Sequence, residues 1–214
     1  MMQRIVNYIY PRVSFERFFS YLSQLLIYRW GLKRLGEQTY ISSFAHLLNM
    51  RCIAIGENST ISRRTSLLAF TSYGETSYEP SLSIGSNVYV GKGCTIACCN
   101  EVTIEDGVTI GDNVYIADSM HGYSEIGTRI MEQALSVGHI RIGSNSWLGY
   151  ACFIAHDVEI GEHAIIAANS VVKKSVPPYS VVAGSPARVI KRYDFDKREW
   201  IKASPDTDLI DDPT

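Results

Sequence analysis

The sequence lacks an excess of charge of either sign, an even set of cysteines and a long uncharged hydrophobic run. Its formal net charge is −2 over 214 residues, so we expect no basic face that would bind nucleic acid. Its five cysteines suit reduced thiols better than a disulfide framework. No signal-peptide pattern opens the chain, and the uncharged run between Arg17 and Arg29 is shorter than the about 20 residues of a membrane span. We therefore expect a single-domain cytoplasmic protein.

A repeat of six residues organises most of the chain. At every sixth position stands an aliphatic residue, usually with a small residue directly after it. The clearest run comprises Ile142, Leu148, Ile154, Ile160, Ile166 and Val172. Earlier runs comprise Ile84, Val90 and Ile96, then Ile104, Ile110 and Ile116, and more faintly Ile55, Ile61 and Leu67. A second small or apolar residue follows four positions later, for example Val88, Cys94, Val108, Val114, Cys152, Val158, Ala164 and Ser170.

Turn residues occur three positions after the aliphatic residue. They are Asn58, Asn87, Gly93, Gly107, Asn113, Asn145 and Asn169, and both residue types tolerate left-handed backbone angles. An α-helix would repeat at 3.6 residues and an ordinary strand at two, so a period of six suits neither. The pattern predicts an all-β solenoid in which about three hexads make one triangular coil that stacks on the next.

These residues resemble the hexapeptide-repeat acyltransferases over residues 50 to 192. The resemblance implies a left-handed parallel β-helix, whereas the general preference for right-handed crossovers would favour the opposite hand. We divide the chain into an N-terminal helical or cap segment (1–50), a β-helix domain (51–192) with an excursion loop (122–141), and a C-terminal extension with a flexible acidic tail (193–214).

Residues 14–35 carry apolar side chains at helical spacing, with Ser14 and Gly36 as candidate ends of a helix. One interpretation is a cap over the open first coil. The alternative is peripheral membrane contact, because basic residues flank the apolar stripe. At the other end, four aspartates after residue 205 indicate a solvated, disordered tail.

The hexads stop after the one that Ile116 opens and resume only at Ile142. His121 stands at the root of this interruption, and protruding loops on rigid scaffolds commonly carry function. A histidine has an unperturbed pKa of about 6.5 and can take a proton near neutral pH. The stretch from Ile116 to Tyr123 resembles the family's Asp-His-x-His-Gly motif, with Ser119 in place of the first histidine. The resemblance implies that His121 is the general base.

Asp118 either orients the His121 ring or is a plain corner residue. We expect Asp118, Tyr123 and His139 to contact the acceptor. The donor implied by the resemblance is acetyl-CoA, and Trp147 would lie beside the groove that holds its pantetheine arm. The backbone at Tyr150 and Ala168 would contact the thioester and this arm, and an N–H there would stabilise the oxyanion of the tetrahedral intermediate. Trp147 could instead pack at a subunit contact. The resemblance also implies that four basic residues bind the phosphates of the donor; the alternative is that they form a solvated face. They are Lys173, Lys174, Arg188 and Lys191.

The family further implies a homotrimer with active sites at the subunit interfaces. The segment from Ser170 to Ser180, the loop root at His121 and the extension from Tyr193 to Trp200 look most like O-acetyltransferases of surface polysaccharide and lipopolysaccharide assembly, similar to maltose and galactoside acetyltransferases. We therefore expect a sugar hydroxyl as acceptor, with the nitrogen of an amino sugar as the alternative.

Two other functions compete with this interpretation. A zinc enzyme resembling the γ-type carbonic anhydrases would need closely spaced metal-binding histidines, whereas His156 and His163 are seven residues apart. A noncatalytic scaffold would not need His121. A serine acetyltransferase is disfavoured because its large helical N-terminal domain has no counterpart. We expect no metal requirement.

Overall fold

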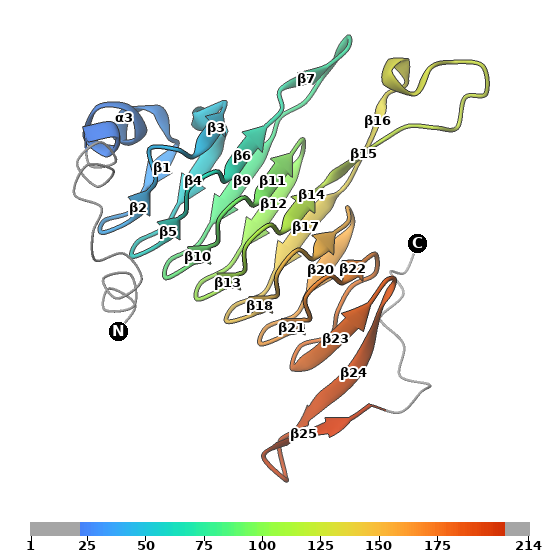
Figure 1. Cartoon of the computed structure of the whole chain (residues 1–214). Helices are drawn as coiled ribbons and strands as arrows, with labels where there is room; N and C mark the ends of the chain where they lie inside the picture. The colour runs from blue at the N-terminus through green and yellow to red at the C-terminus, as the bar shows by residue number, and fades with distance from the viewer. Residues whose placement is uncertain (1–21, 204–214) are drawn as a thin grey trace.

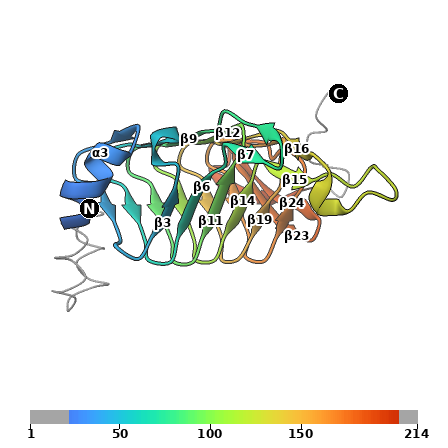
Figure 2. The ribbon, with the colours of Figure 1, turned by 90° about the horizontal axis from the view of Figure 1, so that it is seen from above.

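Three parallel β-sheets form the three sides of a triangular β-helix in the computed structural model, which describes residues 22–203 (Figures 1 and 2). Sheet A contains β1 (Arg34–Leu35), β4 (Ile53–Ile55), β9 (Ser81–Ile84), β12 (Glu101–Ile104), β17 (His139–Ile142) and β20 (Val158–Ile160). Sheet B begins with β2 (Tyr40–Ile41), β5 (Thr60–Ile61), β10 (Tyr89–Val90), β13 (Thr109–Ile110), β18 (Trp147–Leu148) and β21 (Ile165–Ile166). Sheet C contains β3 (His46–Leu48), β6 (Ser66–Ala69), β11 (Thr95–Cys98), β14 (Tyr115–Ala117), β19 (Phe153–Ile154) and β22 (Val171–Val172).

The chain visits sheets A, B and C in turn, so one strand of each makes one coil. Equivalent residues of successive coils pair in register, as Ile110 does with Val90 and with Leu148. The aliphatic residue of each predicted hexad is buried inside the prism, with at most 3% of its surface exposed. The second inward position is also buried. The predicted core is therefore confirmed.

The corners have the backbone that the turn residues predicted. All seven asparagines and glycines named above have a positive φ, between 53° and 73°. Small residues after the aliphatic position are needed because the next coil lies directly against them. A Cβ on Gly143 would come within 2.6 Å of the Glu162 nitrogen, and one on Gly149 within 2.7 Å of the Ala168 nitrogen.

The helical N-terminal segment ends earlier than expected. Its described part begins at Leu22 and includes η1 (Gln24–Tyr28) and α3 (Arg29–Gly31), and residues 14–21 lie outside the described residues. Tyr28 and Leu32 join the core at the first coil, while Trp30 is exposed. Because β1 pairs with β4, the chain enters the β-helix at Arg34. The boundary predicted at residue 50 and the helix end near Gly36 are therefore too late.

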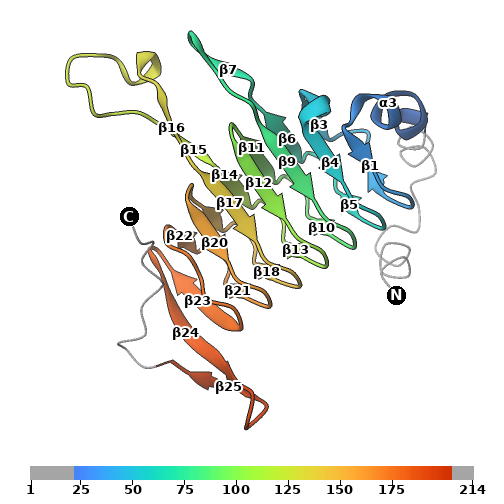
Figure 3. The ribbon, with the colours of Figure 1, turned by 180° about the vertical axis from the view of Figure 1, so that it is seen from behind.

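An antiparallel ribbon follows the last coil. Sheet B continues into β23 (Ser180–Gly184), β24 (Ala187–Asp194) and β25 (Glu199–Lys202), of which β24 and β25 pair antiparallel with their neighbours (Figure 3). Tyr193 meets Phe195 and Trp200 edge to face in this ribbon. The predicted acidic tail lies outside the described residues. Across residues 22–203, no helix has the length and apolar character needed to cross a membrane.

Three insertions leave the prism at one corner, between sheet C and sheet A. They are η2 (Met50–Cys52) after β3, a hairpin of β7 (Ser72–Tyr73) and β8 (Thr76–Ser77) after β6, and the excursion after β14. The excursion leaves through β15 (Ser119–His121), passes η3 (Ile130–Glu132) and returns through β16 (Leu135–Val137) to β17. Its bounds are therefore shifted slightly toward the N-terminus relative to the predicted 122–141. The hairpin and the excursion project in the same direction (Figure 1).

Candidate functional site

Asp118 anchors the root of the excursion. Its carboxylate is fully buried and accepts the N–H groups of Cys99 and Asn100 at 2.7 and 2.8 Å, at the corner of the preceding coil. Its carbonyl oxygen accepts the Gly138 N–H at 2.7 Å, where the excursion returns. A carboxylate enclosed in this way does not reach an acceptor. The burial of Asp118 therefore does not fit the prediction that it binds substrate, and its contacts are those of a corner residue.

The excursion is folded by its own hydrogen bonds. Gln133 is buried; its side chain accepts the Glu125 N–H and donates to the carbonyl oxygens of Glu125 and Thr128. At the base, β15 pairs antiparallel with β16, so that His121 lies opposite Leu135. Gln133 was not a candidate from the sequence, because a single glutamine in an irregular segment has no periodic signal.

His121 lies exposed at the end of β15, and its ring meets a tyrosine from the other insertion. The Tyr73 hydroxyl oxygen is 3.2 Å from His121 Nδ1 and 2.9 Å from the Met131 carbonyl oxygen. The two rings meet edge to face, with centroids 5.4 Å apart. Tyr73 was missed because it lies 48 residues before His121 in a short hairpin that breaks the repeat.

The residue at the position of the missing family histidine points away from solvent. Ser119 is half-buried, and its hydroxyl accepts a hydrogen bond from the Cys99 thiol at 3.3 Å. Burial raises the pKa of Cys99, and it raises the pKa of Cys98 further with help from the Asp118 charge. Thiols held protonated in this way are not nucleophiles, so the cysteines beside Asp118 do not compete with the His121 imidazole as a reactive group.

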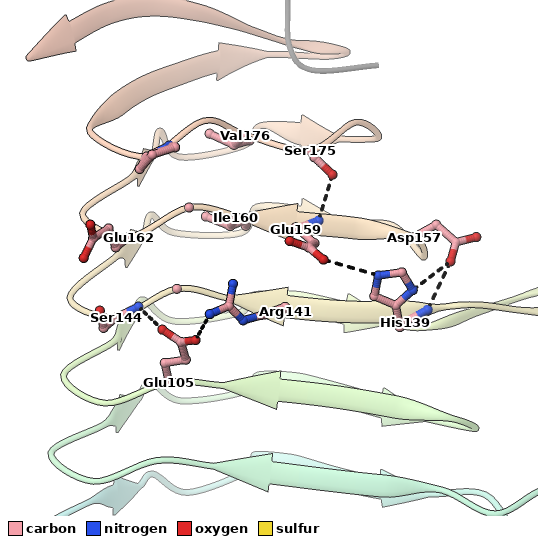
Figure 4. Close-up of a pocket in the computed structure, with 13 residues that line it drawn as sticks. Glu105, His139, Arg141, Ser144, Asp157, Glu159, Ile160, Glu162, Ser175 and Val176 are labelled. Carbon is pink, nitrogen blue, oxygen red and sulfur yellow. Dashed lines mark hydrogen bonds and ion pairs between the residues drawn. The ribbon is translucent and has the colours of Figure 1, made fainter. Parts of the chain in front are cut away.

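Of the other predicted acceptor residues, Tyr123 follows His121 in the excursion and is 67% exposed. His139 lies instead in β17, on the outer surface of sheet A (Figure 4). Its ring nitrogens are 3.5 Å from an Asp157 oxygen and 3.7 Å from a Glu159 oxygen. His139 thus faces two carboxylates, and no contact joins its ring to that of His121.

A polar hollow of about 560 Å³ surrounds His139. Within it Arg141 pairs with Glu105, which also accepts the Ser144 N–H at 2.8 Å (Figure 4). Burial alone would raise the pKa of Asp157, but hydrogen bonds from His156 and from the backbone N–H of His139 lower it. No group of three histidine, cysteine, aspartate or glutamate side chains suited to a metal ion occurs among residues 22–203.

The predicted donor residues lie on sheet B and at the corner between sheets B and C. Trp147 is 53% exposed on the outer face of β18, and Tyr150 is 54% exposed just after that strand. Ala168 occupies the equivalent corner one coil later, next to Asn169, whose N–H donates to the Tyr150 carbonyl at 2.8 Å. This corner and the corner that bears His121 are separated by the width of sheet C.

The four predicted basic residues fall in two places. Lys173 and Lys174 follow β22 at the corner between sheets C and A, the corner from which the excursion also leaves. Arg188 and Lys191 project from β24 in the antiparallel ribbon and are exposed. One nitrogen of Arg188 donates to the carbonyl of its neighbour Ala187 at 2.8 Å. The lysine pair thus lies on the same edge of the prism as His121 but two coils further along the chain, and the other two residues lie elsewhere.

Comparison with known families agrees with this architecture. The family described as bacterial transferase hexapeptide matches residues 139–174, and the hexapeptide repeat of succinyl-transferase matches residues 81–117. The galactoside O-acetyltransferase of Escherichia coli K12 is 35% identical over 180 residues, which cover 79% of this chain and 84% of that enzyme. The chain belongs to the hexapeptide-repeat transferases. The predicted family and left-handed parallel β-helix are confirmed.

Other relatives of this hexapeptide-repeat protein are longer than the matched part. A Mycobacterium tuberculosis protein named "Probable acetyltransferase Rv3034c" is 27% identical over 164 residues, which cover 75% of this chain and 50% of that protein. A Staphylococcus aureus Mu50 protein that is also named as an acetyltransferase is 36% identical over 122 residues, which cover 57% of this chain and 60% of that protein. The chain thus spans only about half to three fifths of these relatives.

Solved structures share the hexapeptide-repeat fold. AntD, an N-acyltransferase from Bacillus cereus in complex with dTDP and 3-hydroxybutyryl-CoA, has a TM-score of 0.68 at 20% identity and covers 82% of this chain and 90% of its own. A maltose O-acetyltransferase from Clostridium difficile 630 has a TM-score of 0.56 at 23% identity, covering 84% of this chain and 82% of its own.

Proposed function

We propose that this protein transfers an acetyl group from acetyl-CoA to a hydroxyl group of a sugar, with His121 as the general base. The observation that carries the proposal is the exposed His121 imidazole at the root of the excursion, where a rigid corner held by Asp118 supports it. The kinship with galactoside O-acetyltransferase supports a sugar acceptor. The role in surface polysaccharide or lipopolysaccharide assembly and the cytoplasmic location stay predictions.

The chemistry follows from one proton transfer in each direction. His121 takes the proton of the acceptor hydroxyl while its oxygen attacks the thioester carbon. The tetrahedral intermediate carries an oxyanion, which a backbone N–H at Tyr150 or Ala168 would stabilise by about 3 kcal/mol. The C–S bond then breaks, and the imidazolium returns the proton to the departing thiolate. The products are the acetyl ester and CoA, and no metal takes part in these steps.

A homotrimer with shared sites is part of the proposal. His121 and the donor residues Tyr150 and Ala168 belong to different corners of one prism. A site that uses both corners therefore draws on two neighbouring subunits. Trp147 and the basic residues at 173, 174, 188 and 191 would bind the donor, and Tyr123 would contact the acceptor. Membrane contact through residues 14–35 stays a prediction.

Replacing the base tests the proposal. We expect His121→Ala to lower kcat by about two to four orders of magnitude, because a positioned general base contributes that much. The affinity for acetyl-CoA should stay within about threefold of the wild-type value. The measurement is release of free CoA thiol with a panel of sugars, together with calorimetric titration of acetyl-CoA.

Two controls accompany this test. His46→Ala should leave turnover unchanged, because His46 is an exposed residue of β3 in the first coil, whereas His121 follows the fourth coil. Amino sugars in the panel distinguish O-acetylation from N-acetylation. N-acetylation is the alternative because AntD, a protein of the same fold, is an N-acyltransferase. Full turnover by His121→Ala would remove this residue from the mechanism, and failure of the wild-type protein to bind acetyl-CoA would favour a noncatalytic scaffold.

A further inference from the structure

Two insertions leave the prism two coils apart, and the end of the hairpin contacts the excursion near its base. The hairpin β7–β8 follows the second coil and the excursion follows the fourth, yet Tyr73 in β7 contacts both His121 and Met131 of the excursion. Views from opposite sides show both insertions projecting from the same corner (Figures 1 and 3). The hairpin turn begins at Gly74, with a φ of +58°, which is the glycine that a type II′ turn requires. The turn therefore presents Tyr73 beside the excursion.

The hydrogen bonds of Tyr73 can be assigned by counting protons. A phenol has one O–H proton, and a backbone carbonyl can only accept. The 2.9 Å contact with the Met131 carbonyl oxygen therefore uses the Tyr73 proton. The contact of 3.2 Å with His121 Nδ1 must then run the other way, with the Nδ1–H donating to the phenol oxygen.

This assignment determines which nitrogen of the neutral ring carries the lone pair. A neutral imidazole has one N–H and one acceptor nitrogen. With the proton on Nδ1, the acceptor is Nε2. We propose that Tyr73 is a positioning residue for His121, whose hydroxyl holds the imidazole in the tautomer with Nδ1–H and so leaves Nε2 to take the acceptor's proton. This inference rests on the proposed function of His121 as a general base.

The same contact suits both protonation states of the ring. When Nε2 takes a proton, Nδ1–H still donates to the Tyr73 oxygen, and a hydrogen bond from a charged ring is stronger. No rearrangement is needed during the proton transfer. The edge-to-face contact of the two rings restricts the orientation of the imidazole as well. A phenylalanine at 73 would keep that ring contact and remove only the hydroxyl.

The test compares two single variants, each of which replaces one tyrosine by phenylalanine and so removes one hydroxyl. Tyr73→Phe removes the proposed hydrogen bonds. Tyr78→Phe is the matched control, because the buried Tyr78 hydroxyl has no hydrogen-bond partner among the described residues. The tautomer of His121 is measured from the ¹⁵N chemical shifts of selectively labelled histidines, and His121→Gln assigns the signal by its loss. Melting temperatures check that each variant folds.

We expect the wild-type signal to report Nδ1–H and the Tyr73→Phe signal to shift toward Nε2–H. In the same variant kcat should fall about 10- to 100-fold, the loss typical when a hydrogen-bond partner that orients a metal-bound histidine is removed, with the KM for acetyl-CoA unchanged. Tyr78→Phe should match the wild-type protein in all three measurements.

Three results would overturn the inference: a wild-type ring with Nε2–H, a Tyr73→Phe variant that keeps the wild-type tautomer whatever its rate, or a changed tautomer with full turnover. The spectrum requires no activity, so the inference is tested apart from the proposed function. Turnover retained by His121→Ala would contradict only the proposed function. The ¹⁵N spectra would still show whether Tyr73 determines the tautomer of His121.

Discussion

Four of the five cysteines act as small apolar side chains inside the coil. Cys94 and Cys152 occupy the second inward position of their hexads, and Cys98 and Cys99 lie at the corner held by Asp118. Burial raises the pKa of Cys94 to about 11 and that of Cys152 to about 12. The folded protein therefore prefers these groups as neutral thiols, which agrees with the sequence-based prediction of reduced thiols rather than a disulfide framework.

This preference makes stability depend on pH in the alkaline range. The pKa of Cys94 is raised from 9.0 in the unfolded reference to about 11, so its contribution is complete below pH 9 and disappears as the pH rises through 11. We expect the free energy of unfolding to fall over this interval, by about 1.4 kcal/mol for each unit of the pKa difference. Urea unfolding at pH 8, 9, 10 and 11 measures it.

Cys94→Ala provides the comparison, because it removes the thiol and leaves the other titrating groups in place. Its curve of unfolding free energy against pH should be flatter than that of the wild-type protein between pH 9 and 11. Parallel curves for the two proteins would mean that burial does not perturb this thiol.

At the scale of elements, the strands and corners follow from the sequence because each hexad repeats the same local requirement. Ile110, Asn113 and Val114 lie where their spacing predicts, since the coil that would bury them is specified by neighbours six residues away. The first coil was missed because Leu35, Ile41 and Leu47 keep the period of six without the turn residues of the later coils. Three positions after them stand Gln38, Phe44 and Met50 instead of asparagine or glycine. The contact of Tyr73 with His121 could not be predicted, since it joins two irregular insertions whose meeting depends on the whole stack between them.

The corner held by Asp118 is an element whose stability can be measured. Asp118→Ala would leave the buried N–H of Cys99 and the partly buried N–H of Asn100 without their acceptor, and we expect a loss of about 3 kcal/mol in the free energy of unfolding. Asp106→Ala is the matched control, because Asp106 accepts the Ser86 N–H at an exposed corner where water can replace it. Thermal and urea unfolding give both values; equal losses for the two variants would argue against a special role of the buried corner.

At the scale of the whole molecule, the separation of the two corners leads to a prediction about mixed assemblies. His121→Ala and Ala168→Phe should each be inactive, the first by loss of the base and the second by filling the donor groove. Co-expressed with different tags and purified through both, the two variants should regain up to about a third of the wild-type activity, because one of the three interfaces in each mixed trimer pairs two intact half-sites.

Analytical ultracentrifugation of the same sample would check for a trimer. Mixed assemblies without any activity would indicate that the residues of one site all come from a single chain.

The number of coils between the hairpin and the excursion determines whether Tyr73 can reach His121. Removing or adding one complete turn of the prism there would preserve every hydrogen-bonded ladder and every buried stack, because the joined coils share one register. Yet it would displace the phenol from the imidazole by a whole layer. In this protein the number of coils between the two insertions is therefore constrained by the contact between two loops, and not by the stability of the solenoid that carries them.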